Sequence, residues 1–276
     1  MFLRRSVTLA MSLKNYSSEA KNLVAVAVNN QTGVATVTLQ RPPVNSLNLE
    51  LLNELSSALT ELEEKKARGI ILKSSSDSVF SAGLDIHEFS NTEEGRLKKF
   101  WTALQDVWIK LYGHSAPTVA CINGHAPAGG CLLALSCEYR VMLKQKTIGL
   151  NETKLGIVAP LWFIASMENV IGRRLTELSL TTGKMYTTEE ALKIGLIDEI
   201  AEDTNDAVSK SENFLKLFQN ISPFARSQTK KFIRGNTVQS LVKTREADLK
   251  AFIDDITSEK VQKGLKVYME SLKKGK

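Results

Sequence analysis

Residues 118–143, TVACINGHAPAGGCLLALSCEYRVML, decide the fold of this chain. The apolar runs Thr118–Ile122 and Tyr139–Leu143 each predict a buried strand. Between them, Gly129 and Gly130 open an apolar segment, residues 131–137, that is typical of a short buried helix. A strand, a helix and a second strand in this order predict a βαβ unit with parallel strands.

The N-terminal half continues this alternation of strands and helices. Val24–Val28 and Val34–Leu39 predict two strands joined by a turn. Asn48 predicts the N-cap of a leucine-rich helix, and residues 69–72 predict a further short strand. We therefore expect an α/β core.

Helical periodicity dominates after residue 160. The predicted helices cover residues 161–171, 174–181, 206–218, 224–234, 240–256 and 259–272. Thr187 and Glu190 have the spacing of a capping box, and Gly195 is suited to end that short helix. The predicted division is an α/β core over residues 21–200 and a helical C-terminal segment over residues 201–276.

Residues 1–20 have the composition of a mitochondrial transit peptide. They carry Arg4, Arg5 and Lys14 with no acidic residue before Glu19, and leucines are interspersed with hydroxyl residues. A secretory signal needs a longer uninterrupted apolar core. A frayed cytosolic tail is the other alternative.

Composition places the remainder among ordinary globular proteins. The chain has 276 residues, 43% hydrophobic and 24% charged, and we expect no membrane span. The net charge of +6 is spread without a basic run of the nucleic-acid-binding type, and it suits an anionic small ligand at least as well. Cys121, Cys131 and Cys137 lie in or beside apolar segments without zinc-site spacing, so we expect reduced, buried thiols and no metal.

Two glycine-rich turns, FSAGLD (residues 80–85) and PAGG (residues 127–130), each precede helical sequence. The backbone N–H groups of Leu84 and of a helix start near Gly129 are suited to stabilise a developing negative charge. Tight packing of a helix on a sheet is the alternative explanation for the glycines. Asp85 is expected to cap the turn that follows it.

Glu152 is a lone carboxylate in an otherwise uncharged stretch, IGLNET (residues 148–153). Burial there would raise its pKa toward values useful to a general base. A structural glutamate bonded to a backbone N–H is the alternative. Asn151 could orient this carboxylate or bind a ligand. The three histidines, His87, His114 and His125, are interpreted as surface or supporting residues.

These motifs, with RPPVNSL (residues 41–47) and ING (residues 122–124), resemble the crotonase (enoyl-CoA hydratase/isomerase) superfamily over residues 24–272. The resemblance is greatest to its isomerase branch, through LNET and the following LGIVAPLW (residues 155–162). It implies a crotonase (ClpP/crotonase-like) fold of repeated ββα units with a helical C-terminal trimerisation segment. It also implies a homotrimer in the mitochondrial matrix and an acyl-CoA thioester substrate, with no cofactor.

The resemblance further assigns roles to individual residues. Glu152 falls on the catalytic carboxylate, and the N–H groups of Leu84 and Gly129 would bind the thioester oxygen. The expected substrate-binding residues are Ala82, Gly83, Leu84, Asp85, Ile86, Gly129 and Asn151. The candidates for an apolar acyl pocket are Leu132, Leu161, Trp162, Phe163 and Phe252, and for most of them core packing is the preferred alternative.

Leu132 distinguishes the chain from the hydratases, which resemble it but carry a second glutamate at this position. Leucine cannot help to activate water, so hydration is disfavoured. The resemblance then implies an isomerase that moves the double bond of 3-enoyl-CoA to give trans-2-enoyl-CoA in the β-oxidation of unsaturated fatty acids. Thioester hydrolysis or weak hydration on the same scaffold, and a crotonase-like RNA-binding or scaffold protein, are the alternatives.

Overall fold

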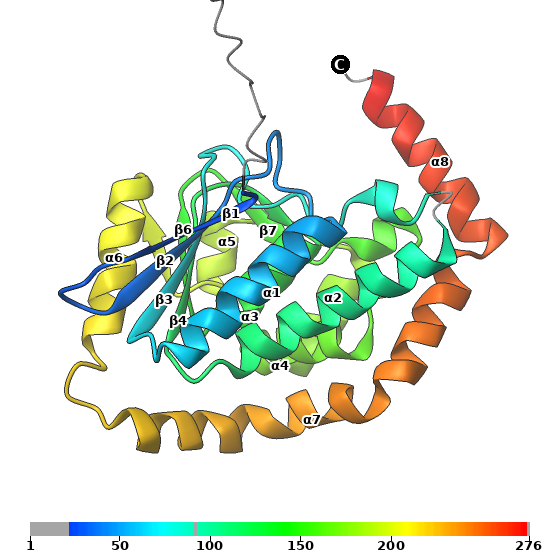
Figure 1. Ribbon diagram of the computed structural model, residues 1–276. Coiled ribbons are helices and arrows are strands. Elements are labelled where there is room, and N and C mark those ends of the chain that lie inside the picture. The colour runs from blue at the N-terminus through cyan, green and yellow to red at the C-terminus, as the bar shows by residue number, and fades with distance from the viewer. Residues whose placement is uncertain (1–21, 91–92, 275–276) are drawn as a thin grey trace, which may run out of the picture.

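The computed structural model describes residues 22–90 and 93–274 and confirms the α/β class (Figure 1). The strands of the larger sheet are, in spatial order, β1 (Val24–Val28), β2 (Val34–Leu39), β3 (Gly69–Ser74), β4 (Thr118–Ile122), β6 (Tyr139–Leu143) and β9 (Glu199–Ala201). β1 pairs with β2 in antiparallel orientation, and the other pairs are parallel. The predicted βαβ unit over residues 118–143 is therefore confirmed.

A smaller sheet was not predicted. It consists of β5 (Ala126–Pro127), β7 (Thr147–Gly149) and β8 (Tyr186–Thr187). The helices are α1 (Leu49–Glu64), α2 (Glu94–Gly113), α3 (Gly129–Ser136), α4 (Leu161–Thr182), α5 (Thr188–Lys193), α6 (Thr204–Lys216), α7 (Pro223–Ile256) and α8 (Glu259–Lys274). Two short 3-10 helices are η1 (Ile86–Glu88) and η2 (Glu152–Leu155).

Helices cover both faces of the larger sheet, so its strands are apolar on both sides. Ile71 and Val119 face α6 in a small apolar cluster. Their neighbours Ile70 and Ala120 face the opposite way, into the main core beneath α1, α2 and α3. Figure 1 shows α6 to the left of the sheet and α1, α2 and α3 to its right.

The predicted helix caps are confirmed. The N–H of Leu51 donates to Asn48 Oδ1 at 3.1 Å, and Thr187 and Glu190 form the reciprocal capping box. The predicted break between residues 171 and 174 is present as a kink at Gly172, where φ is 76° and ψ is 162°.

The predicted break between residues 234 and 240 is wrong, because α7 runs without interruption over 34 residues. A glycine inside a helix costs only about 1 kcal/mol. Contacts with the core hold α7 on both sides of Gly235: Lys230 Nζ donates to His114 O at 2.8 Å, and Arg245 pairs with Asp106 at 2.7 Å.

The C-terminal helices wrap the core: α7 runs along the edge of the molecule below α2 and leads up to α8 (Figure 1). The predicted transit peptide, residues 1–20, lies outside the described residues. None of the described helices has the length and apolar composition needed to cross a membrane.

Candidate active site

Pairing in the small sheet brings the Gly129 turn beside Glu152. β5 and β7 are parallel, with Pro127 opposite Gly149, and Ala128 N donates to Gly149 O at 2.8 Å. β5 leads into the first residue of α3, Gly129, and β7 leads into the first residue of η2, Glu152. Two strands of only two and three residues thus place a helix start next to a carboxylate.

Hydrogen bonds to the segment before α1 hold the Gly83 turn in place. Leu47 N donates to Gly83 O at 2.8 Å, and Asp85 N donates to Leu47 O at 3.0 Å. Gly83 has φ of 90°, a conformation that favours glycine. A Cβ at this position would also lie 3.0 Å from Gly129 N, so the two glycine turns are in contact and leave no room for a side chain.

Two backbone N–H groups lie at this contact, those of Leu84 and Gly129. Within the described part of the chain, neither Leu84 N nor Gly129 N has a hydrogen-bond partner. Gly129 N also lies at the N-terminus of α3, the positive end of the helix dipole. Ala128, at the N-cap, has φ of 47° and ψ of −122°, which is strained for a residue with a Cβ. Free N–H groups beside a strained turn are suited to bind an oxyanion.

Glu152 is a buried carboxylate without a partner. Its exposed fraction is 7%, and neither Oε1 nor Oε2 accepts a hydrogen bond from the described residues. Burial raises the pKa of Glu152 to about 7, and the smaller influence of its own backbone N–H lowers it. A carboxyl group with this pKa can both take up and release a proton near neutral pH.

A cavity of about 160 Å³ joins the glycine turns to Glu152. Its lining residues are Ala82, Leu84, Ile86, Phe89, Trp101, Pro127, Ala128, Asn151, Glu152, Leu155, Ile157, Val158, Pro160, Phe163, Phe252, Ile256 and Tyr268. Among these, Glu152 is the one carboxylate, and most of the others are apolar. Asn151 Oδ1 is buried without a partner among the described residues, so it adds an acceptor near Glu152.

Asp85 differs from the other predicted binding residues because its side-chain carboxylate already has partners within the protein. It pairs with Arg41 at 2.8 Å and accepts a hydrogen bond from His87 N at 3.1 Å, which is the predicted cap. Of the predicted binding residues, the described cavity lining includes Ala82, Leu84, Ile86 and Asn151 and lacks Gly83, Asp85 and Gly129.

The candidates for the acyl pocket lie in different places. Phe163 and Phe252 line the cavity, whereas Leu132 is buried within α3 and contributes nothing to the described lining. Leu161 is 81% exposed, and Trp162 packs behind Phe163 with ring centroids 4.5 Å apart. Apolar character alone did not reveal which side of each helix faces the ligand.

Four lining residues carried no local signal in the sequence. Phe89 directly follows η1, Trp101 lies in α2, Ile256 ends α7, and Tyr268 lies in α8. They meet only because the C-terminal helices fold back over the core. Their place in the cavity depends on long-range packing, which the hydrophobic periodicity of the sequence does not predict.

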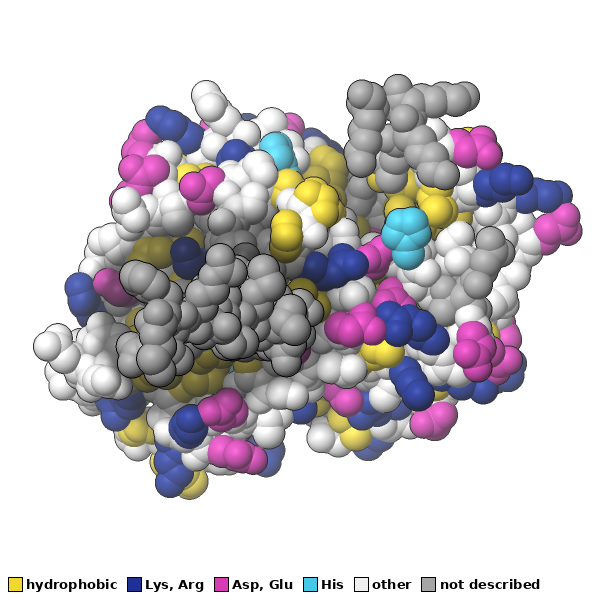
Figure 2. Space-filling model, turned by 45° about the horizontal axis from the view of Figure 1, so that its top comes forward, with side chains coloured by type: hydrophobic (Ala, Val, Ile, Leu, Met, Phe, Trp, Pro, Cys, Tyr) yellow, Lys and Arg dark blue, Asp and Glu magenta, His cyan; other side chains and the backbone are white. Residues whose placement is uncertain are grey.

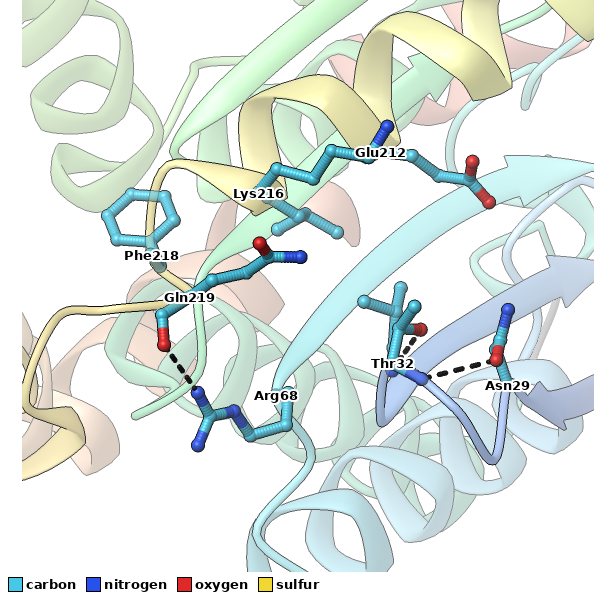
Figure 3. A pocket seen from close by; sticks show the side chains of 9 residues that line it. Asn29, Thr32, Arg68, Glu212, Lys216, Phe218 and Gln219 are labelled. Carbon is cyan, nitrogen blue, oxygen red and sulfur yellow. Dashed lines mark hydrogen bonds between the residues drawn. The ribbon is translucent and has the colours of Figure 1, made fainter.

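A second cleft lies away from this cavity, between the β1–β2 turn and the end of α6 (Figure 3). Asn29, Arg68 and Lys216 are among its lining residues, and Arg68 Nη2 donates to Gln219 O at 3.2 Å. Asn29 Oδ1 accepts hydrogen bonds from the backbone of its own turn. These polar groups have local structural partners, so the cleft offers no comparable chemistry.

The histidines His114 and His125 have structural partners. His114 Nε2 lies 3.3 Å from Leu59 O, and His125 Nδ1 lies 2.9 Å from Thr147 Oγ1. The three cysteines are free and buried, as predicted. Among the described residues, no group of three or more His, Cys, Asp or Glu side chains is arranged to hold a metal ion.

Known proteins share this sequence and architecture. The family model described as enoyl-CoA hydratase/isomerase matches residues 29–275. The rat protein "Enoyl-CoA delta isomerase 1, mitochondrial" is 41% identical over 92% of this chain and 88% of its own length. The crystal structure of human mitochondrial delta3-delta2-enoyl-CoA isomerase has a TM-score of 0.89 and 40% identity, covering 92% of this chain and 99% of that one. An enoyl-CoA hydratase structure from Bacillus halodurans has a TM-score of 0.81 and 27% identity, covering 89% and 99%.

Proposed function

The chain belongs to the enoyl-CoA hydratase/isomerase family, with its crotonase fold, and on this basis we propose that it is an enoyl-CoA delta isomerase. It converts a 3-enoyl-CoA to trans-2-enoyl-CoA and so serves the β-oxidation of unsaturated fatty acids. The observation that carries the proposal is Glu152, a buried carboxylate without a partner among the described residues, in a cavity that Leu84 and Ala128 also line. Gly129, which follows Ala128, contacts Leu84, so its N–H lies close to the Leu84 turn.

The reaction begins with proton abstraction next to the thioester carbonyl. The Glu152 carboxylate removes a proton from C2, and the electron pair of the broken C–H bond moves onto the thioester oxygen to give a dienolate. Leu84 N–H and Gly129 N–H bind this oxyanion. Removing one such donor typically raises the barrier by about 3–4 kcal/mol.

The same carboxyl group completes the isomerisation. Protonated Glu152 delivers its proton to C4, the thioester carbonyl re-forms, and the new double bond lies between C2 and C3. A pKa of about 7 suits both steps, since the group must gain and lose the same proton. This sequence consumes no water and needs no metal or redox cofactor.

The absence of a second carboxylate in the described cavity lining favours isomerisation over hydration. Hydration needs a positioned water and a second acid or base. Leu132, the residue at the relevant position of α3, is only 1% exposed and apolar. Hydrolysis of the thioester would likewise require a water held beside the carbonyl carbon.

We further propose that the protein is a homotrimer. Four large apolar side chains on α4 and α7 are more than two-thirds exposed in a single chain: Leu161, Phe224, Phe232 and Ile233. Exposed apolar groups of this size are typical of interaction surfaces. Light scattering of the purified protein tests this, with a mass of three chains expected.

The proposed location is the mitochondrial matrix. It rests on the printed names of the rodent and human relatives and on the basic, acid-poor composition of residues 1–20. An RNA-binding role fits less well, because Figure 2 shows basic and acidic side chains interspersed across that face.

Incubation of the purified protein with trans-3-hexenoyl-CoA tests the proposal. Conjugated 2-enoyl thioester should form with no change in mass. A gain of one water would instead indicate a hydratase, and release of free CoA a thioesterase. No turnover, together with salt-sensitive RNA retention on filters, would favour the binding protein.

A further inference from the structure

Two stacked aromatic rings separate the Glu152 cavity from a larger groove of about 900 Å³ between α4 and α7. Trp101 and Phe252 line both spaces, as do Val158 and Pro160. The Trp101 and Phe252 rings are nearly parallel, with 7° between their planes and 3.6 Å between their centroids. We call these two rings the aromatic wall.

Asp248 holds one ring of the aromatic wall in place. Trp101 Nε1 donates to Asp248 Oδ2 at 2.7 Å, and Gln105 Nε2 donates to the same oxygen at 2.8 Å. Trp162 Nε1 donates to Asp248 Oδ1 at 3.1 Å. Hydrogen bonds to a carboxylate are stronger than neutral ones, so the Trp101 indole has little freedom to rotate.

One turn of α7 supplies both the acceptor and the second ring. Asp248 and Phe252 are four residues apart and therefore share a face of the helix. That face packs on α2, which carries Trp101, and the ion pair between Arg245 and Asp106 at 2.7 Å fixes the same contact. The wall is consequently part of the α2–α7 interface.

We propose that the aromatic wall limits the length of the acyl chain that this site accepts, with Asp248 as its positioning residue. The inference rests on the proposed function, since it takes the Glu152 cavity as the acyl site. A chain longer than the cavity must either displace Phe252 or leave its end in water. Each methylene group left in water forfeits about fourfold in affinity.

Phe252→Ala tests the wall because it removes one ring and joins the cavity to the groove. The probes are hexanoyl-CoA and dodecanoyl-CoA, measured by isothermal titration calorimetry. Their saturated chains have no double bond to move, so binding is measured independently of isomerisation. The ratio of the two affinities should shift toward dodecanoyl-CoA by about tenfold, as expected for opening an apolar pocket.

Phe214→Ala is the matched control. Phe214 is also a stacked phenylalanine, 4.1 Å from Tyr139 between ring centroids, but it lies at α6 and borders the other core cluster. Its substitution should leave the affinity ratio unchanged. An unchanged ratio in Phe252→Ala, or an equal shift in both variants, would overturn the proposal.

Asp248→Asn gives a second readout with little change in shape. The amide retains one acceptor oxygen and loses the other, so Trp101 and Trp162 cannot both keep their bonds. The ratio should shift in the same direction as in Phe252→Ala, accompanied by a change in tryptophan fluorescence. A fluorescence change without a shift in the ratio would show that Asp248 supports folding alone and would contradict its positioning role.

These experiments distinguish a failure of the aromatic-wall proposal from a failure of the proposed function. Turnover of trans-3-hexenoyl-CoA by the unaltered protein with no shift in the ratio would overturn the wall and leave the isomerase intact. A shift in the ratio without any turnover would establish the wall and reject the isomerase.

Discussion

Gly83 and Gly129 are in direct contact: a Cβ placed on Gly129 would lie 3.2 Å from the Cα of Gly83. This contact sets Gly129 N beside Leu84, which lines the Glu152 cavity together with Ala128. Since the two turns are 46 residues apart in the chain, the donor pair exists only when α3 and the segment before η1 are packed together. The packing of two glycines is therefore the basis of the proposed oxyanion site.

Gly83→Ala should abolish most isomerase turnover. The new methyl group would lie 2.9 Å from Ala128 Cβ and 3.0 Å from Gly129 N, forcing the two donors apart. Loss of such a donor lowers kcat by about a hundredfold or more. Gly195→Ala is the control, since Gly195 also has positive φ, 74°, but has nothing within 4 Å of its Cβ position. It should lose about 1 kcal/mol of stability and keep its kcat; equal losses of kcat in both variants would reject the oxyanion assignment.

The pH dependence of kcat/KM should report the pKa of Glu152. Burial raises that pKa to about 7, and only the ionised form can accept the proton from C2. The rate should therefore rise with pH through a midpoint near 7 and level off at higher pH. A midpoint near 4.5, the ordinary value for a glutamate, would mean that the reacting base is not buried Glu152.

Glu152→Gln should stabilise the fold at alkaline pH. The native carboxyl has a pKa of about 7 and the unfolded one 4.5, so the native state binds more protons between these values. Stability then falls as pH rises through this window, by up to about 3 kcal/mol. Urea unfolding at pH 8 should show the variant as more stable, and the difference should shrink toward pH 4.5. An equal or lower stability at pH 8 would contradict the burial of an unpaired charge.

Glu138→Gln should destabilise the attachment of α7 to the core. The Glu138 carboxylate binds Arg226 and lies 2.9 Å from Lys230 Nζ, and Lys230 is only 6% exposed. Removing one partner of a buried ionic group costs about 3–5 kcal/mol because the other charges lose compensation. Thermal or urea unfolding measures this. The exposed pair of Glu259 and Lys263 provides the control, and Glu259→Gln should change stability by less than about 0.5 kcal/mol.

Much of the core could be predicted from the sequence because its signals are local. The strands Thr118–Ile122 and Tyr139–Leu143 are short apolar runs bounded by turn residues, and they were placed correctly. The small sheet was not predicted, because β5 and β8 have two residues each and carry no periodicity. The continuity of α7 through Gly235 was missed for a related reason, since tertiary contacts outweigh one glycine.

The residues of the candidate site were likewise predicted where they belong to local motifs and missed where their position depends on long-range packing. Leu84, Gly129 and Glu152 come from motifs that the sequence displays. In the structure Leu84 and Glu152 line one cavity, and Gly129 contacts Leu84. Trp101 and Tyr268 were missed, because their place in that cavity depends on how α2 and α8 pack. The exposure of Leu161, a candidate for the acyl pocket, could not be derived from hydrophobicity, because hydrophobicity does not show which side of α4 faces the core.

The most direct test of this account is the turnover of trans-3-hexenoyl-CoA by Glu152→Gln beside the unaltered protein. Glutamine keeps the size of the side chain but cannot take up the proton from C2. The unaltered protein should form 2-enoyl-CoA at unchanged mass, and the variant should be slower by a factor of about 10³ or more. Near-normal turnover by a folded Glu152→Gln variant would show that another group moves the proton and would contradict the mechanism.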